Sequence, residues 1–345
     1  MYNIDNYLIP YWTGNTMYDE SAFVLEDENG GILPINLLYK PDKILSVTDS
    51  ELKITYKEGT DYSFENGVLK VLPGGNIPVM KYKDYYLDEP IEGKSFERQN
   101  GKYLAFAETV HMYPKQIAVT YTHSDSWNGF IPEKQGTKFP KLMKKLENKE
   151  PVKILLFGDS IAAGANATSR SGRGPGLPTW IELFTDELKK RYGYDDISFV
   201  NTSVGGKSSK WGLETVAENA LCHESDLAII AFGMNNGGTP NDEFEADIRG
   251  IRDAIAEKMP ECEFILIAPM VPNKELKFFW GNQIIQKDAL AHLKDERTVM
   301  ADMTDYHLSL LEHKKFYDMT GNNVNHPNDF LIRGYAHLLL RTVEK

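Results

Sequence analysis

The pattern of hydrophobic and polar residues changes near residue 145 of the chain. Before this point, short runs alternate between apolar and polar residues, and turn sequences such as ENGG at 28–31 separate them. Alternation with a period of two is typical of half-buried β-strands. We therefore expect an all-β sandwich over residues 1–145, with strands at 21–27, 43–49, 52–59, 67–72 and 115–123.

From Val152 onward, strongly apolar runs alternate with longer segments of helical periodicity. Strands are expected at 153–157, 197–201, 227–232, 264–269 and 297–302. Helices are expected near 178–192, 209–221, 241–258, 281–294 and 328–343, after a short polar helix or linker at 141–151. The repeated strand–helix–strand order predicts an α/β domain over residues 146–345, with a parallel sheet between two layers of helices.

Composition excludes several classes of partner. The chain has 345 residues, of which 41% are hydrophobic and 26% charged, and this is an ordinary globular composition. Its net charge of −12 argues against binding to nucleic acid or to an anionic membrane surface. The two cysteines, Cys222 and Cys262, do not make a disulfide framework, and no ligand-like spacing of Cys and His suggests a metal site.

The first residues, MYNIDNYLIPYWTGN, do not combine a basic segment with a long apolar one, as a secretory signal would. No run in the chain reaches the about 18 apolar residues of a membrane span. A cytoplasmic location is therefore expected. The sequence gives no indication of the oligomeric state.

The predicted strand at 153–157 runs directly into Gly158, Asp159 and Ser160. One interpretation is structural, because Gly and Asp favour turns and Ser is a common helix N-cap. The other is chemical, because open α/β sheets place their ligands at the carboxyl ends of the strands. These three residues alone do not decide between the two interpretations.

Suitable partners for Ser160 follow at the ends of later elements. Gly206 lies in the turn after the second predicted strand, Asn235 lies after the third, and His326 precedes the last predicted helix. Acyl transfer by a serine needs a base for the hydroxyl proton and donors for the oxyanion. These residues supply His326 as the base, and the N–H groups of Ser160 and Gly206 with the Asn235 amide as donors.

The order GDS, Gly, Gly-x-Asn and a late His before a terminal helix resembles the SGNH (GDSL) hydrolase superfamily over about residues 152–345. The resemblance implies a flavodoxin-like three-layer domain, with Ser160, Gly206, Asn235 and His326 in the roles just described. The β-rich leader resembles that of carbohydrate acetylesterases of the second carbohydrate-esterase family. That likeness implies a jelly-roll-like sandwich before the catalytic domain.

The chain departs from the family pattern at two acids. Asn236 stands where the family usually has Asp, and Asn323 stands three residues before His326 where an Asp is usual. The group that orients the His326 ring could be the Asn323 side chain, the Asp329 carboxylate or a backbone carbonyl, as in Ser-His dyads of the superfamily. We favour a backbone carbonyl, because an amide does not offset the charge that forms on the ring.

Three further residues are candidates for substrate binding. Trp211 and Trp280 could stack on sugar rings, although a role in the core or in a domain interface is as plausible for each. Asn273 lies just past the fourth predicted strand and could line the cleft.

These observations predict a two-domain serine esterase. We expect it to remove acetyl or other small acyl groups from carbohydrate, such as oligosaccharides from plant polysaccharides, without a metal or an organic cofactor. One alternative is a lipid-directed esterase or thioesterase that uses the same site. Another is a carbohydrate-binding protein with an inactive esterase domain, which the two missing acids would explain.

Overall fold

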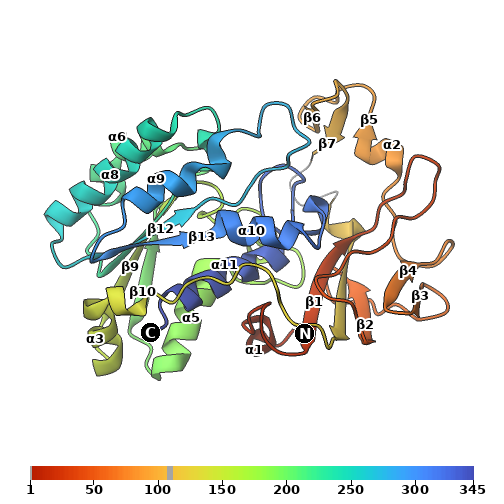
Figure 1. The fold of residues 1–345 in the computed structure, drawn as a ribbon, viewed down its shortest axis with the longest axis horizontal. Helices are drawn as coiled ribbons and strands as arrows, with labels where there is room; N and C mark the ends of the chain where they lie inside the picture. The colour runs from red at the N-terminus through yellow and green to blue at the C-terminus, as the bar shows by residue number, and fades with distance from the viewer. Residues whose placement is uncertain (1, 107–111) are drawn as a thin grey trace.

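The protein is described here by a computed structural model, which covers residues 2–106 and 112–345. Figure 1 shows two regions side by side: an α/β region around β9–β13 on the left and a β-rich N-terminal region on the right. No helix of the described residues is long and apolar enough to cross a membrane.

A five-stranded parallel sheet forms the centre of the α/β region, in the order β10-β9-β11-β12-β13. This is the flavodoxin-like order, and the prediction of a parallel sheet is confirmed. The strands lie within one or two residues of the predicted runs, at Val152–Gly158 (β9), Ile197–Asn201 (β10), Leu227–Ala231 (β11), Glu263–Ala268 (β12) and Thr298–Asp302 (β13).

Helices cover both faces of this sheet because its central strands are apolar on both faces. Ile154 and Leu156 of β9 belong to the core under α5 and α11, whereas Leu155 and Phe157 belong to the core under α8 and α9. The helices are α5 (Trp180–Tyr192), α6 (Ser209–Glu214), α7 (Val216–Asn219), α8 (Asn241–Lys258), α9 (Gln286–His292), α10 (Met303–Leu311) and α11 (Asp329–Thr342). The helix predicted at 209–221 is split between α6 and α7.

The described part of the N-terminal region forms three small antiparallel sheets, ordered β1-β8-β2, β3-β4 and β5-β7-β6. Their strands are Thr16–Phe23 (β1), Lys43–Asp49 (β2), Tyr62–Glu65 (β3), Val68–Val71 (β4), Tyr86–Leu87 (β5), Ser95–Glu97 (β6), Tyr103–Ala105 (β7) and Gln116–Thr122 (β8). The region is therefore a β region, as predicted. The strand expected at 52–59 is wrong, because this segment makes only isolated bridges at Thr55 and Glu58.

Short helices complete the fold. The predicted linker is helix α3 (Pro140–Asn148), whose first backbone N–H groups donate to the Glu263 carboxylate at the start of β12. The other short helices are α1 (Ile4–Tyr7), α2 (Tyr82–Tyr85) and α4 (Thr168–Ser171).

The two regions share one hydrophobic core rather than meeting at a thin interface. Tyr11 stacks on Phe330 of α11 with ring centroids 4.3 Å apart, and its hydroxyl donates to the Phe330 carbonyl. Glu20 of β1 pairs with Lys314 at 2.6 Å, and both side chains are fully buried. A domain boundary at residue 145 stays a prediction from the sequence.

Candidate active site

The residues singled out in the sequence gather at the carboxyl edge of the parallel sheet, around β9 and β11. This is the point where the chain reverses its direction of strand addition, and open α/β sheets bind ligands there. Gly158 ends β9 beside Ala231 of β11. A Cβ at position 158 would lie 2.3 Å from the Ala231 carbonyl oxygen, so the two strands approach closely only because this residue is glycine.

Ser160 and His326 lie in contact although they are 166 positions apart in the chain. The distance from Ser160 Oγ to His326 Nε2 is 2.9 Å. On the other side of the ring, Nδ1 lies 2.8 Å from the side-chain oxygen of Asn166. A proton on Nδ1 that donates to this amide oxygen leaves the lone pair of Nε2 free to accept the serine proton. The ring is thus oriented for a general base.

Asn166 therefore orients the His326 ring, although no sequence pattern pointed to it. Asn323, one earlier candidate, accepts from the Tyr85 hydroxyl at 2.9 Å and donates to the Ala105 carbonyl at 3.0 Å. Its amide is bonded to the N-terminal region, so the expectation that it could orient the ring is wrong. Asn323 was a candidate because it stands three residues before His326, where the family usually has Asp. Spacing along the chain does not show where a side chain points.

The carboxylate of Asp329, the other candidate, is also bonded elsewhere. It accepts from the Thr168 backbone N–H at 3.0 Å and from the Thr168 hydroxyl at 2.6 Å. Burial raises the pKa of Asp329 to about 7. Nδ1 instead contacts the side-chain oxygen of Asn166, whereas the sequence had favoured a backbone carbonyl as the group that orients the ring.

Three parts of the chain hold Asn166 in place. Its backbone has a φ of +64°, a left-handed conformation that Asn tolerates better than most residues. Its carbonyl accepts from the Tyr113 hydroxyl of the N-terminal region, and Asp329 fixes Thr168 two residues later. Gly321 packs against its side chain, where a Cβ would lie 2.7 Å from the Asn166 Cβ. The available signal in the sequence was an asparagine six residues after the serine, in a turn that follows Gly164.

The turn that contains Gly206 lies beside the serine. A Cβ on Gly205 would lie 3.8 Å from the Ser160 Cβ, and Gly206 has a φ of +74°. The Asn235 side chain donates one hydrogen bond to the Lys207 carbonyl at 3.0 Å. This bond joins the turns that follow β10 and β11, and the amide has a second N–H that can donate to a ligand.

Asp159 joins the serine turn to the Asn235 turn. Its carboxylate accepts from the backbone N–H of Ile161 at 3.0 Å and of Met234 at 3.2 Å. Burial raises the pKa of Asp159 to about 6. Gly233 gives the second turn its shape, because its φ is +144° and a Cβ there would lie 2.8 Å from Pro269 Cγ. The acid of the GDS sequence thus has a structural role.

Asn236, where the family usually has Asp, bonds the first residue of helix α6. Its side-chain oxygen accepts from the Ser209 backbone N–H at 3.1 Å, and its amide nitrogen donates to the Ser209 hydroxyl at 2.8 Å. The side chain is 1% exposed. Both the donor and the acceptor of the Asn236 side chain are therefore used within the protein.

Asn273 does not line the cleft, so its predicted role in substrate binding is wrong. It is 1% exposed, its amide donates to the Asn323 carbonyl at 3.0 Å, and its side-chain oxygen accepts from the Glu275 N–H at 3.0 Å. Both polar groups of the Asn273 side chain are thus used where the loop after β12 packs against the His326 loop. Asn273 therefore supports the loop that carries the histidine.

Trp211 lies half-buried on the core. Its ring centroid is 5.9 Å from that of Phe157 and 6.4 Å from that of Phe232, and the Lys207 ammonium lies 5.5 Å from it. Between the two interpretations left open by the sequence, these contacts favour a packing role.

Trp280 is half-buried in a segment that runs beside the Asn235 turn. There, Asn282 N–H donates to the Gly237 carbonyl at 2.8 Å, and the Gln283 amide donates to the Met234 carbonyl at 3.0 Å. Phe278, in the same segment, is 78% exposed and was not singled out in the sequence. We call residues 275–283, which adjoin the Asn235 turn, the rim segment.

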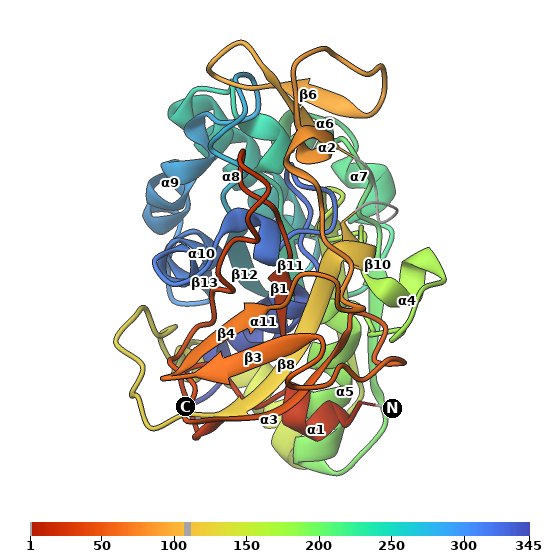
Figure 2. The same ribbon diagram turned by 90° about the vertical axis from the view of Figure 1, so that its right-hand side faces the viewer.

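The N-terminal region holds this rim segment from the other side. Arg98 pairs with Glu275 at 2.6 Å, and Lys277 N–H donates to the Glu97 carbonyl at 3.0 Å. Figure 2 shows β6 and α2 at the same end of the molecule as α6, which follows the Gly206 turn. The N-terminal region therefore contributes to the surroundings of the site.

No metal centre is found in the part of the chain that the structure describes, where no group of three or more His, Cys, Asp or Glu residues could hold an ion.

Comparison with known proteins supports the fold. No curated protein matches the chain. A solved two-domain esterase active on acetylated mannans is 18% identical with a TM-score of 0.50, and the match covers 61% of this chain and 53% of that one. The chain thus spans about half of that esterase, and at this identity the likeness shows the fold alone.

Two smaller solved structures are also similar. The acetyl xylan esterase AlAXEase is 19% identical with a TM-score of 0.45, covering 55% of this chain and 98% of that one. A catalytic mutant of Axe2, an acetylxylan esterase from Geobacillus stearothermophilus, is 17% identical with a TM-score of 0.46, covering 56% of this chain and 94% of that one.

One sequence family matches the α/β region itself. The model of the GDSL-like lipase/acylhydrolase family matches residues 156–330. This range is just over half of the chain and includes both Ser160 and His326. The protein therefore belongs to the GDSL-like lipase/acylhydrolase family.

Proposed function

We propose that the protein is a serine esterase that removes acetyl groups from carbohydrate, such as oligosaccharides from plant polysaccharides. Membership of the acylhydrolase family supports hydrolysis of an ester. The observation that carries the proposal is the contact of 2.9 Å between Ser160 Oγ and His326 Nε2. The choice of an acetylated carbohydrate takes support from the fold shared with an esterase active on acetylated mannans.

In the proposed reaction, Ser160 Oγ attacks the ester carbonyl while His326 Nε2 takes the hydroxyl proton. The backbone N–H groups of Ser160 and Gly206 and the Asn235 amide donate to the oxyanion. His326 then gives its proton to the sugar oxygen as it leaves, and an acyl group remains on the serine. A water molecule, deprotonated by the same imidazole, releases the acid and restores the serine.

Asn166 would hold the ring throughout these steps. Its oxygen accepts the Nδ1 proton both before and after the ring becomes charged, so the tautomer and the orientation are kept. A neutral amide stabilises the imidazolium less than a carboxylate would, because it carries a dipole rather than a full charge. The acyl and sugar groups would face the rim segment of Phe278 and Trp280.

The decisive experiment is the variant Ser160→Ala, tested on acetylated mannan and xylan oligosaccharides, an aryl acetate and a long-chain aryl ester. We expect hydrolysis of the acetyl esters to be lost, and a fluorophosphonate probe to label the wild type but not the variant. Ser198→Ala, at an exposed serine of β10, is the matched control and should keep its activity.

Retention of more than about a hundredth of the wild-type rate in Ser160→Ala would overturn the assignment, since nucleophiles of this kind contribute far more. Activity on the long-chain ester without activity on any acetylated oligosaccharide would instead contradict the choice of substrate.

A further inference from the structure

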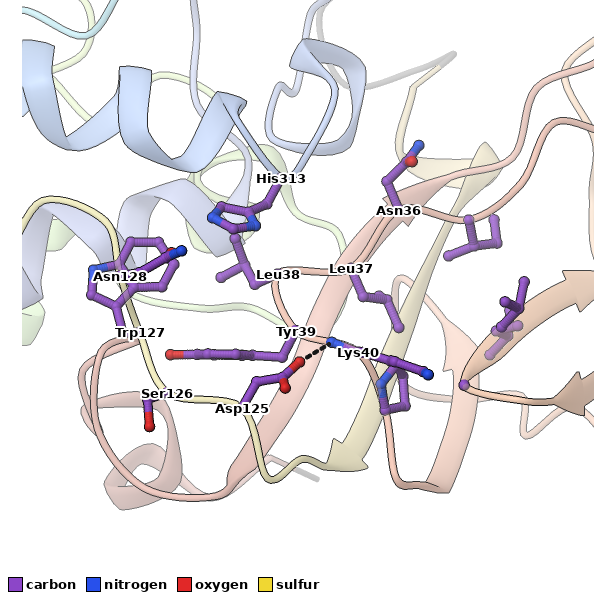
Figure 3. Close-up of a pocket in the computed structure, with 15 residues that line it drawn as sticks. Asn36, Leu37, Leu38, Tyr39, Lys40, Asp125, Ser126, Trp127, Asn128 and His313 are labelled. Carbon is purple, nitrogen blue, oxygen red and sulfur yellow. Dashed lines mark hydrogen bonds between the residues drawn. The ribbon is translucent and has the colours of Figure 1, made fainter.

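A cavity of about 510 Å³ opens in the N-terminal region and has no role in the proposed reaction (Figure 3). Its walls are residues 35–41, the β3–β4 hairpin at 67–69, residues 125–128 and His313 beyond α10. Neither Ser160 nor His326 lines it. The volume lies within the range of about 300–1,000 Å³ that is usual for small-molecule sites.

Aromatic rings are grouped at one end of this cavity. Figure 3 shows Tyr39, Trp127 and His313 together, with Leu37 and Lys40 farther along the wall. The ring centroids of Trp127 lie 6.0 Å from Tyr39 and 5.5 Å from His313. An aromatic wall of this kind offers apolar faces against which the C–H faces of a ligand can pack.

These rings are fixed before any ligand binds. Tyr39 stacks on His123 with centroids 3.7 Å apart, and its hydroxyl donates to the Tyr11 carbonyl at 2.6 Å. The indole N–H of Trp127 donates to the Phe130 carbonyl at 3.0 Å. A ligand would therefore lose little free energy to the ordering of the protein, because the rings are already immobilised.

The polar groups of the cavity are uncharged or balanced. Lys40 and Asp125 are the charged residues that line it, one of each sign, and the backbone N–H of Lys40 donates to the Asp125 carboxylate at 3.3 Å. The exposed side chains of Ser126 and Asn128 make no hydrogen bond within the described residues. They remain free to bond hydroxyl groups, and the balanced charge disfavours phosphate or other strongly charged ligands.

We propose that this cavity binds a short segment of neutral oligosaccharide, as a second carbohydrate site separate from the ester-cleaving one. Sugar rings would pack on the Trp127 side, and their hydroxyls would bond Ser126 and Asn128. The identity of the ligand rests on the proposed function, because the substrate of an enzyme that deacetylates a polysaccharide is itself a chain of neutral sugars. A chain held here raises the local concentration of its acetyl groups near Ser160.

The test is a variant that fills the cavity. Val68, at the tip of the β3–β4 hairpin, is 41% exposed and lines the cavity, so Val68→Trp should occupy its volume without disturbing the core. Ile54→Trp is the matched control, because Ile54 is 55% exposed in the same region but does not line the cavity. Asn128→Ala removes a free amide and is a second, milder variant.

Binding of unacetylated mannohexaose and xylohexaose is measured by titration calorimetry, so hydrolysis is not needed. At least one of the two should bind to the wild type and to Ile54→Trp, at least tenfold more weakly to Val68→Trp and a few-fold more weakly to Asn128→Ala. KM for an acetylated polysaccharide should rise in Val68→Trp, while kcat/KM for an aryl acetate stays unchanged.

No binding of either oligosaccharide to the wild type, or equal binding by Val68→Trp, would overturn this site. Neither result bears on hydrolysis of the aryl acetate or of acetylated oligosaccharides, which tests the proposed function separately.

Discussion

Removing the Asn166 side chain tests whether an amide, rather than an acid, orients the His326 ring. The variant of choice is Asn166→Gly. Alanine would confound the result, since the backbone at 166 has a φ of +64° and a left-handed alanine costs roughly 1–2 kcal/mol. Glycine adopts this conformation without strain.

The expected loss follows from the bond of 2.8 Å between Nδ1 and the Asn166 oxygen. A hydrogen bond to a charged group contributes about 1.5–3 kcal/mol, and the ring is charged only as the serine attacks. At 1.36 kcal/mol for each factor of ten, kcat should fall by about 10- to 160-fold. KM should change little, because Asn166 contacts the histidine rather than the site of the sugar.

The assay is steady-state hydrolysis of an aryl acetate over pH, together with thermal unfolding of each variant. Asn166→Asp gives a second readout, because a carboxylate at this position stabilises the imidazolium and should move the acid limb of the kcat profile to higher pH. It also removes the Asn166 amide nitrogen, which is buried without a partner within the described residues. A merely structural role would not move this limb.

Asn66→Gly is the matched control, since Asn66 is an exposed asparagine with a φ of +55° in the β3–β4 turn. Its kcat should equal that of the wild type. Our reasoning would be refuted if folded Asn166→Gly kept more than about a third of the wild-type kcat. An acid limb in Asn166→Asp that coincided with the wild-type limb would count equally against it.

Three further predictions concern the oxyanion, a buried acid and a buried ion pair. Asn235→Ala should lower kcat by about 10²–10³, the range for one lost oxyanion donor, and an unchanged kcat would mean that the amide only joins two turns. Burial raises the pKa of Asp329 from 3.8 to about 7, so its contribution to stability is full below about pH 4 and is lost as the pH rises through about 7. The free energy of unfolding of the wild type, relative to Asp329→Asn, should therefore fall by about 4 kcal/mol between pH 4 and pH 8 in denaturant titrations, and a constant difference would contradict it. Glu20→Ala should destabilise the protein by about 3–5 kcal/mol, because it leaves the fully buried Lys314 ammonium without its carboxylate. Adding Lys314→Met should restore part of that loss. A loss below about 1 kcal/mol in Glu20→Ala alone would contradict the stabilising role of this ion pair.

The sequence determined the parallel sheet because the signal for such a sheet is local. A strand buried on both faces is a continuous apolar run, and Ile154 to Phe157 is one. The alternation of apolar runs with helical segments also placed Ser160, Gly206 and Asn235 after strands, and the carboxyl ends of parallel strands lie at one edge of the sheet. Their proximity was therefore predictable before any tertiary contact was known.

The N-terminal region was predictable only in kind. Alternation identified β2 and β8 closely, but it also suggested a strand at 52–59 that forms only isolated bridges. Strands as short as β5, with two residues, and β6, with three, carry too few positions for a period to appear. Both pair with β7, and the adjoining Arg98 bridges to Leu276 and pairs with Glu275 in a distant segment of the chain.

Only the tertiary structure decided which group orients His326. Asn166, Asn323 and Asp329 are all short polar side chains near a loop, and the sequence offered only the last two as candidates while favouring a backbone carbonyl. The fold packs the turn after Ser160 under the histidine loop and bonds Asn323 and Asp329 elsewhere. A hydrogen bond depends on position and direction within a few tenths of an ångström, whereas a sequence pattern records only the order of the residues. The sequence thus fixes which chemistry is available at the sheet edge, and the packing of distant loops selects the residues that make contact.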